Sequence, residues 1–270
     1  MDHRLEARIV SLVLYGGTAL VLIFFYVPIF TLIVFSFHEG RYPAMPIDGW
    51  SLKWYWQLFA TRDFLTALGN TATVAIMVTI VSTIIATGGA LAWARLRFRL
   101  KRAYQMLTAA PLLFPQLLLG IVLLLWFSIL GNWFDFGTGP LTVVVGHLVY
   151  LTPFAMLIIT VQVHNLDPTL EDAARDCGAS TWEVYREITL PLMWPGIFSA
   201  GIFVLLLSWG NFYITYSLAG TARTLPTFIY SGIALGGSSP IYPALATVIF
   251  IPGLLLVFVA ERYRRRAMHR

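Results

Sequence analysis

The chain has 270 residues, of which 58% are hydrophobic and 11% are charged, and its net charge is +5 at pH 7. A soluble domain carries about 25% charged residues, so this composition argues for a membrane protein. The single cysteine, Cys177, excludes an internal disulfide and a metal site built from cysteines alone. The charges lie at the ends of apolar segments, which argues against a nucleic-acid partner.

Six apolar runs are long enough to cross a bilayer, which takes about 20 residues each. No Asp, Glu, Lys or Arg lies inside any of them. The first run exceeds the roughly 7–15 apolar residues of a signal peptide, so we expect a retained first helix. The predicted spans are Ile9–Phe37, Thr71–Ala94, Tyr104–Leu130, Leu141–Val163, Ile197–Ala219 and Ile241–Ala260.

The distribution of Lys and Arg predicts how these spans are oriented, because cytoplasmic loops are enriched in both. Only four of the 18 lie on one side of the predicted membrane: Arg41, Lys53, Arg62 and Arg223. We therefore expect both termini, the Arg95–Lys101 loop and the Asp167–Pro191 loop to face the cytoplasm. The outward loops are then His38–Asn70, Gly131–Pro140 and Gly220–Pro240.

The polar loop between the fourth and fifth spans predicts two short helices. Thr169–Asp172 and Ser180–Glu183 each fit the capping pattern of Ser or Thr followed three residues later by an acid. Gly178 is expected to end the first helix with a positive φ. The second helix is expected to run through Ile188 and to end at Leu190-Pro191, where the chain returns to the membrane.

This loop also carries apolar side chains that an ordinary connector does not need. Connectors are usually only a few residues long, and this loop is much longer. It also places three apolar side chains, Trp182, Tyr185 and Ile188, in a polar segment. Exposed apolar surface of that kind usually marks a partner site. An ordinary loop between helices is the alternative.

The spacing of the loop resembles the EAA loop of ABC importer permeases, with Asp in place of the usual Glu. The matching positions are Asp172, Ala173, Ala174, Gly178, Ile188, Leu190 and Pro191. In that family the loop docks on an ATPase subunit and passes its motion to the membrane domain. The resemblance implies an all-α membrane protein with six transmembrane helices, the type I ABC importer permease fold. Residues 1–270 then form one permease domain, and residues 164–195, including Trp182, form its cytoplasmic coupling loop.

Other stretches are similar to the polyamine branch of these permeases. They are Tyr26-Val27-Pro28-Ile29, Leu52-Lys53-Trp54-Tyr55 and Arg95-Leu96-Arg97-Phe98-Arg99. The resemblance implies a bacterial inner-membrane location and a second permease subunit, forming a heterodimer. It also implies two ATPase subunits that bind ATP and Mg, an external solute-binding protein, and contact with membrane lipid.

The sequence lacks the motifs of an enzyme or an ATPase. No G-x-x-x-x-G-K-[ST] occurs, and both lysines, Lys53 and Lys101, follow a leucine. No two histidines are spaced to share a helix face, so no metal or cofactor is expected in this chain. We therefore predict that ATP hydrolysis is supplied by a separate subunit.

Polar residues in the fifth span predict a candidate substrate pathway. Ser208, Asn211 and Thr215 are spaced to share one helix face, with Trp209 and Tyr213 beside them. Polar groups at that depth need a protein or water neighbour, which a solute path supplies. Packing between helices explains the same residues equally well, and both interpretations stay open.

Two other classes of function remain at this stage. A secondary carrier or channel would work without an ATPase, but ion-driven carriers normally need ionisable residues in the membrane. The spans lack carboxylates and show no inverted repeat, which disfavours this class. A membrane-anchored assembly protein would use the polar loop to dock a partner without transport.

Overall fold

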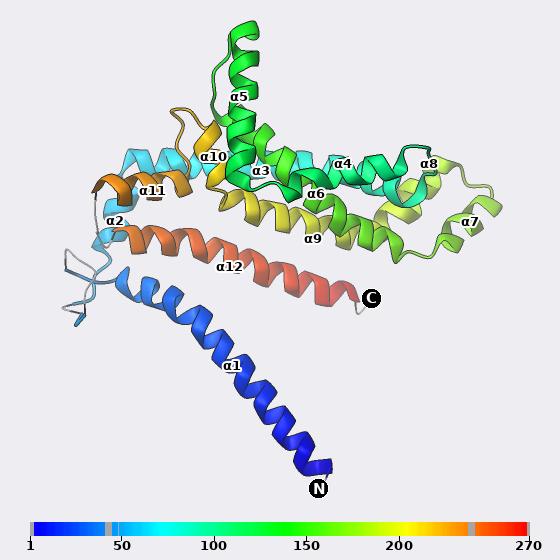
Figure 1. Cartoon of the computed structure of the whole chain (residues 1–270). Coiled ribbons are helices and arrows are strands. Elements are labelled where there is room, and N and C mark those ends of the chain that lie inside the picture. The colour runs from blue at the N-terminus through cyan, green and yellow to red at the C-terminus, as the bar shows by residue number, and fades with distance from the viewer. Residues whose placement is uncertain (1–2, 41–44, 48, 237–240, 269–270) are drawn as a thin grey trace. The chain divides into compact units, whose positions relative to one another are not determined.

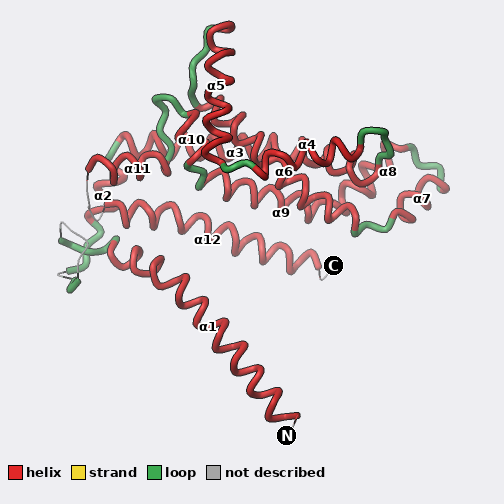
Figure 2. Tube along the Cα trace, viewed as in Figure 1, coloured by secondary structure: helices red, strands yellow, loops and turns green. Residues whose placement is uncertain are grey.

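The computed structural model describes residues 3–40, 45–47, 49–236 and 241–268, and every regular element in them is a helix (Figures 1 and 2). Arg41, and residues 237–240 at the end of the predicted outer loop Gly220–Pro240, lie outside the described part of the chain. An isolated β-bridge joins His38 to Trp50. The all-α class predicted from the sequence is confirmed.

Six helices in the described residues are long and apolar enough to cross a membrane, as the sequence predicts. Although two of the predicted spans are interrupted, each of these helices overlaps one predicted span. They are α1 (His3–Phe35), α3 (Arg62–Arg95), α5 (Gln116–Phe134), α6 (Pro140–His164), the helix Thr181–Trp209 and α12 (Ile241–Met268).

Shorter helices lie between the spans. The sequence prediction placed none at α2 (Lys53–Ala60) or α11 (Leu225–Gly236), which lie in the predicted outer loops. The remaining short helices are α4 (Lys101–Leu113), α7 (Pro168–Asp176), α8 (Thr181–Val184) and α10 (Tyr213–Leu218), and α9 is Leu190–Trp209.

The third predicted span, Tyr104–Leu130, is not one helix. The chain breaks at Phe114-Pro115, between α4 and α5. Phe114 is extended, with φ −86° and ψ 135°, because the ring of a following proline disfavours the helical conformation. The apolar composition of this run concealed the break, since α4 and α5 are both apolar.

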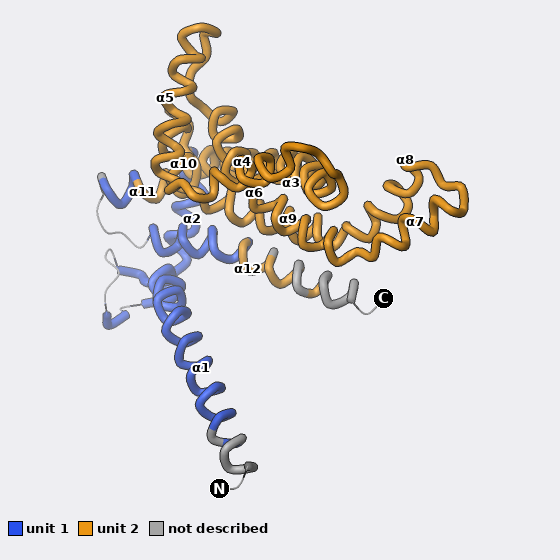
Figure 3. The backbone as a smooth tube through the Cα atoms, turned by 45° about the vertical axis from the view of Figure 1, so that its right-hand side comes forward, with its two compact units in different colours: residues 1–62, 231–252 blue, residues 63–230, 253–270 orange. Residues whose placement is uncertain are grey.

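The chain forms two compact units, coloured separately in Figure 3: residues 1–62 with 231–252, and residues 63–230 with 253–270. In the first, side-chain hydrogen bonds fix the turn that follows α1. The indole N–H of Trp54 donates to the His38 carbonyl at 2.7 Å, and the hydroxyls of Ser36 and Tyr55 lie 2.6 Å apart. This turn positions α2 close to the end of the first span.

The second unit contains the hydrophobic core and all the candidate site residues. Helices α3, α6 and α9 contribute most of its buried side chains, among them Ala86, Ile159 and Val204, which are fully buried. Small residues allow close approach. A methyl group on Gly146 of α6 would overlap Leu218 and Ile214 of α10.

Candidate functional site

The first helix of the polar loop, α7, begins at Pro168 and is capped by Asp167. The sequence prediction, which placed the cap at Thr169, is wrong. The Asp167 carboxylate accepts a hydrogen bond from the Thr169 N–H at 2.9 Å, and Pro168 occupies the first helical position. This bond lowers the pKa of Asp167, so the cap is kept above that pKa and lost when the pH falls through it. Because Pro168 occupies the first helical position, the capping residue is the one before it, Asp167.

The turn after α7 has the conformation predicted for it. Gly178 has φ +90°, its N–H donates to the Arg175 carbonyl at 2.9 Å, and the Ala179 N–H donates to the Ala174 carbonyl at 3.0 Å. These two bonds form a Schellman motif, which ends a helix with a left-handed residue. Gly178 therefore sets the angle between α7 and the helix that follows.

The second loop helix begins with the predicted capping box. The Ser180 N–H donates to Glu183 Oε2 at 2.7 Å, and the Glu183 N–H donates to Ser180 Oγ at 3.3 Å. The predicted end at Leu190-Pro191 is wrong. A π turn at Tyr185–Thr189 precedes Pro191 and changes the hydrogen-bond register, so the helix continues through it into the membrane span.

The motif residues of the loop differ in their exposure. Trp182 is 64% exposed and its ring lies 5.7 Å from that of Tyr185, while Ile188 and Leu190 are half-buried. Asp172 is exposed and pairs with Arg175 at 2.7 Å. The exposed motif positions are Asp172, Ala173, Gly178, Trp182 and Pro191, and Ala174 is half-buried. A partner protein would therefore meet Trp182 and the outer side of α7.

Sequence reasoning missed Glu171, which is buried although its neighbours are exposed. Its carboxylate contacts Arg95 of α3, Arg175 of α7 and the hydroxyl of Thr189. Only the negative charge at the helix start pointed to this residue in the sequence. Its partner on α3 is too distant along the chain for a sequence pattern to reveal.

The fifth predicted span is not a single helix either. Helix α9 ends at Trp209, Gly210 follows as its C-cap, and α10 begins at Tyr213. The Asn211 carbonyl Oδ1 accepts from the Ile214 N–H at 3.2 Å, so this side chain takes the place of a helical backbone bond. Ser208, Asn211 and Thr215 therefore do not share one continuous helix face.

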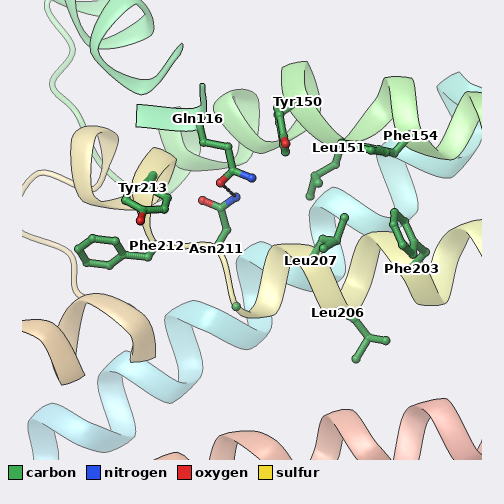
Figure 4. A pocket seen from close by; sticks show the side chains of 11 residues that line it. Gln116, Tyr150, Leu151, Phe154, Phe203, Leu206, Leu207, Asn211, Phe212 and Tyr213 are labelled. Atoms are coloured by element: carbon green, nitrogen blue, oxygen red, sulfur yellow. Dashed lines mark hydrogen bonds between the residues drawn. The ribbon is translucent and has the colours of Figure 1, made fainter. Parts of the chain in front are cut away.

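A cavity of about 370 Å³ lies beside this break (Figure 4). Asn211 and Tyr213 from the predicted pathway line it. Asn211 Nδ2 donates to Gln116 Oε1 of α5 at 3.4 Å, so two amides meet at the cavity wall. The other lining residues are Tyr150, Leu151, Phe154, Phe203, Leu206, Leu207, Gly210 and Phe212.

The other predicted pathway residues lie outside this lining. Ser208 and Thr215 are buried, and each lies 2.9 Å from a ring nitrogen of His147, Ser208 from Nδ1 and Thr215 from Nε2. Trp209 does not line the cavity, and its buried indole N–H has no partner among the described residues. Ser208 and Thr215 are thus buried against His147, while Asn211 and Tyr213 line the cavity.

His147 joins the two sides of the break, because Ser208 belongs to α9 and Thr215 to α10. We expect His147→Leu to lower the thermal unfolding temperature of the detergent-solubilised chain, because each hydrogen bond between membrane helices contributes roughly 0.6–2 kcal/mol. His164→Leu, at an exposed site on the same helix, is the matched control. Equal unfolding temperatures for the two variants would refute a stabilising role for His147.

The cavity has the chemistry of a site for an organic molecule. Five of its lining side chains are aromatic, two are amides, and none is a carboxylate, a lysine, an arginine or a histidine. Aromatic faces attract organic cations, and amide oxygens accept hydrogen bonds from them. The described residues contain no cluster of three or more His, Cys, Asp or Glu that could hold a metal ion.

Comparison with known proteins places the chain in one family. The family model described as binding-protein-dependent transport system inner membrane component matches residues 84–270. The putrescine transport system permease protein PotI of Escherichia coli (strain K12) is 30% identical over 90% of this chain and 88% of that protein. The spermidine/putrescine transport system permease protein PotC of Haemophilus influenzae is 27% identical over 91% of this chain and 94% of that protein.

Solved structures share the fold. A chain of the bacterial alginate ABC transporter, in complex with its alginate-bound periplasmic protein, matches 97% of this chain and 96% of its own length with a TM-score of 0.75 and 18% identity. A chain of the MetNI methionine ABC transporter matches 80% of this chain and 98% of its own length, with a TM-score of 0.62 and 18% identity. With the family model covering residues 84–270 and a 30% identical relative matched over most of its length, the chain belongs to the binding-protein-dependent inner-membrane components of ABC importers.

Proposed function

We propose that this importer permease carries an organic amine, of the class that includes putrescine and spermidine, through the cavity at the break between α9 and α10. The observation that carries the proposal is the cavity wall, where aromatic rings surround the amide pair of Asn211 and Gln116. The curated relatives named for putrescine and spermidine transport support the same class of solute.

The wall can bind an ammonium group without a carboxylate. The faces of Tyr150, Phe154 and Phe203 provide cation–π attraction, and the Tyr150 and Phe154 rings are 5.4 Å apart. Each amide oxygen has two lone pairs, and Asn211 Oδ1 uses one of them for the Ile214 N–H. Binding by these groups is weaker than by a carboxylate, which suits a solute that must leave again.

The proposed assembly contains this chain, a second permease, two ATPase subunits that bind ATP and Mg, and an external solute-binding protein. The coupling loop docks on one ATPase through Trp182 and the exposed side of α7. Closure of the ATPase dimer moves α7, and the cavity then opens outward to receive solute. Membership of the ABC importer family favours this mechanism over a carrier or channel that works without ATP.

Reconstitution of the four components into liposomes tests the solute. We expect ATP-dependent accumulation of radiolabelled putrescine when the binding protein is present, and none with a non-hydrolysable nucleotide. A neutral polyol of similar length is the control solute. Accumulation of the polyol without putrescine would overturn the amine assignment, and accumulation driven by an ion gradient without ATP would overturn the proposed energy source.

The orientation is tested by the native cysteine. Cys177 is exposed in the loop that we place in the cytoplasm. A membrane-impermeant maleimide is expected to label Cys177 and Arg99→Cys in inverted vesicles and not in intact spheroplasts. Gly137→Cys, in a Cys177→Ser background, lies in a predicted outer loop with open space around it and is expected to show the reverse. Labelling of Cys177 from outside would overturn the orientation and the ATPase contact together.

A further inference from the structure

Glu171 has three partners on separate parts of the cytoplasmic end of the protein. Its side chain is 12% exposed, whereas the next carboxylate, Asp172, is 71% exposed. Arg95 Nη2 at the end of α3 lies 3.2 Å from Glu171 Oε1, and the Thr189 hydroxyl donates to the same oxygen at 3.2 Å. Arg175 on the next turn of α7 lies 3.7 Å from Oε2.

These contacts give α7 a connection that its place in the chain does not provide. Along the chain, α7 connects only to α6 before it and to α8 after it. The contact with Arg95 adds α3, and Arg95 also donates to the Leu166 carbonyl at 3.4 Å, at the entry to the loop. One arginine of α3 therefore holds both the start of the loop and its first helix.

Helix α3 is well placed to carry a displacement into the membrane. Its Ala90 and Ala86, about one and a half and two and a half turns before the end of the helix at Arg95, are fully buried in the core with residues of α6 and α9. Packed cores move as units rather than deforming continuously. A contact at Arg95 therefore reaches the packed bundle directly, without passing through the turns on either side of α7.

We infer that Glu171 is a positioning residue that joins α7 to Arg95 of α3 and to Thr189 of the π turn, so that movement of α7 is transmitted to the membrane bundle. This role rests on the proposed docking of the loop on an ATPase. Without the ion pair, α7 still folds and docks, because its cap at Asp167 and its end at Gly178 are independent of Glu171. ATP hydrolysis then continues while less of its motion reaches the cavity.

The test measures putrescine accumulated per ATP hydrolysed by the complete complex in liposomes. For Glu171→Gln we expect this ratio to fall about 2- to 30-fold, the range of coupling changes typical of residues that link two sites, while the ATPase rate is retained. The exposed Asp176 on the same helix provides the matched control, and Asp176→Asn is expected to keep the wild-type ratio. A residue that only stabilised the fold would instead lower both rates together.

A double-mutant cycle tests the partner. Arg95→Gln combined with Glu171→Gln is expected to lower the ratio by less than the product of the two single losses, because both changes remove the Glu171–Arg95 ion pair. A wild-type ratio in Glu171→Gln, or losses that multiply in the double variant, would overturn the inference. If Glu171→Gln does not assemble, Thr189→Val decides: it removes only the hydroxyl donor, and a wild-type ratio there would also overturn the inference.

Failure of the proposed function gives a different pattern. A wild-type complex whose ATP hydrolysis does not respond to the binding protein would contradict the docking of the loop. A wild-type complex that responds to the binding protein but moves no putrescine would contradict only the solute. The role of Glu171 is then tested by the stimulation of ATP hydrolysis by the binding protein. This stimulation is expected to be lower in Glu171→Gln than in Asp176→Asn.

Discussion

Gly178→Val is expected to reduce ATP-driven transport while the protein still inserts into the membrane. Gly178 has φ +90° and is exposed, and no atom lies within 4 Å of the position that a Cβ would take. The cost is therefore one of backbone conformation alone, about 1–2 kcal/mol for a left-handed residue with a side chain. That energy changes the equilibrium between the native turn and other conformations by about 5- to 30-fold in favour of the others. The angle between α7 and α8 then changes. Uptake by the reconstituted complex measures the loss.

Two further variants separate the turn from a general effect of valine. Gly137→Val places the same side chain in open space at a glycine without a positive φ, and we expect it to transport at the wild-type rate. Gly178→Asn is expected to recover much of the activity, because Asn tolerates the left-handed region. Wild-type transport by Gly178→Val would show that the angle set by this turn plays no part in coupling.

Asn211→Leu is expected to lower transport at least about tenfold with little loss of assembly. The change leaves the buried Ile214 N–H without its acceptor, at a cost of about 1–3 kcal/mol, and it removes the donor to the half-buried Gln116 amide. It also replaces an amide in the cavity wall with an apolar side chain. Stimulation of ATP hydrolysis by the loaded binding protein is expected to fall in parallel with uptake. Asn132→Leu, at an exposed position of α5, is the matched control.

The charge of the solute is tested at the same position. Asn211→Asp keeps the shape of the side chain and can place a carboxylate in the cavity, so we expect a lower half-saturating concentration for a diamine than in the wild type. A neutral polyol gains nothing from that charge. If Asn211→Asp weakens diamine uptake as much as Asn211→Leu does, the amide serves packing and not the solute.

In the mechanism that we propose, the coupling loop and the cavity work together. The loop consists of two helices with capped ends and a turn at one glycine. Hydrogen bonds between residues close in the chain hold these ends and the turn in place. The cavity depends on an interruption that Gly210 and Asn211 create at the end of α9. His147 stabilises that interruption from α6 by binding Ser208 and Thr215 on its two sides.

The local features of the loop could be predicted from sequence in part. The capping box at Ser180 and the positive φ at Gly178 were predicted correctly, because each depends on residues within five positions of one another. The cap at Thr169 and the helix end at Pro191 were predicted wrongly. In both cases a proline was compatible with two local structures, and the register of the neighbouring turn decided between them.

The polar residues of the fifth span show what a periodic pattern leaves undecided. Ser208, Asn211 and Thr215 fit one helix face, and that spacing suits a pore lining and a packed interface equally. In the folded chain Ser208 and Thr215 lie against His147, which is 61 and 68 residues away from them along the chain. Asn211 instead meets Gln116 at the cavity, 95 residues away.

The sequence by itself determined that the chain is helical and has six spans, because an apolar run of sufficient length must satisfy its own backbone hydrogen bonds in lipid. It also determined the turn at Gly178, which depends on neighbouring residues only. The tertiary structure alone decided the breaks beside the cavity wall, the His147 contacts and the pairing of Glu171 with Arg95. The physical reason is the distance along the chain over which each signal acts. Helix and turn signals depend on a few neighbouring residues, whereas the partner of a buried polar group depends on where the packed helices place it.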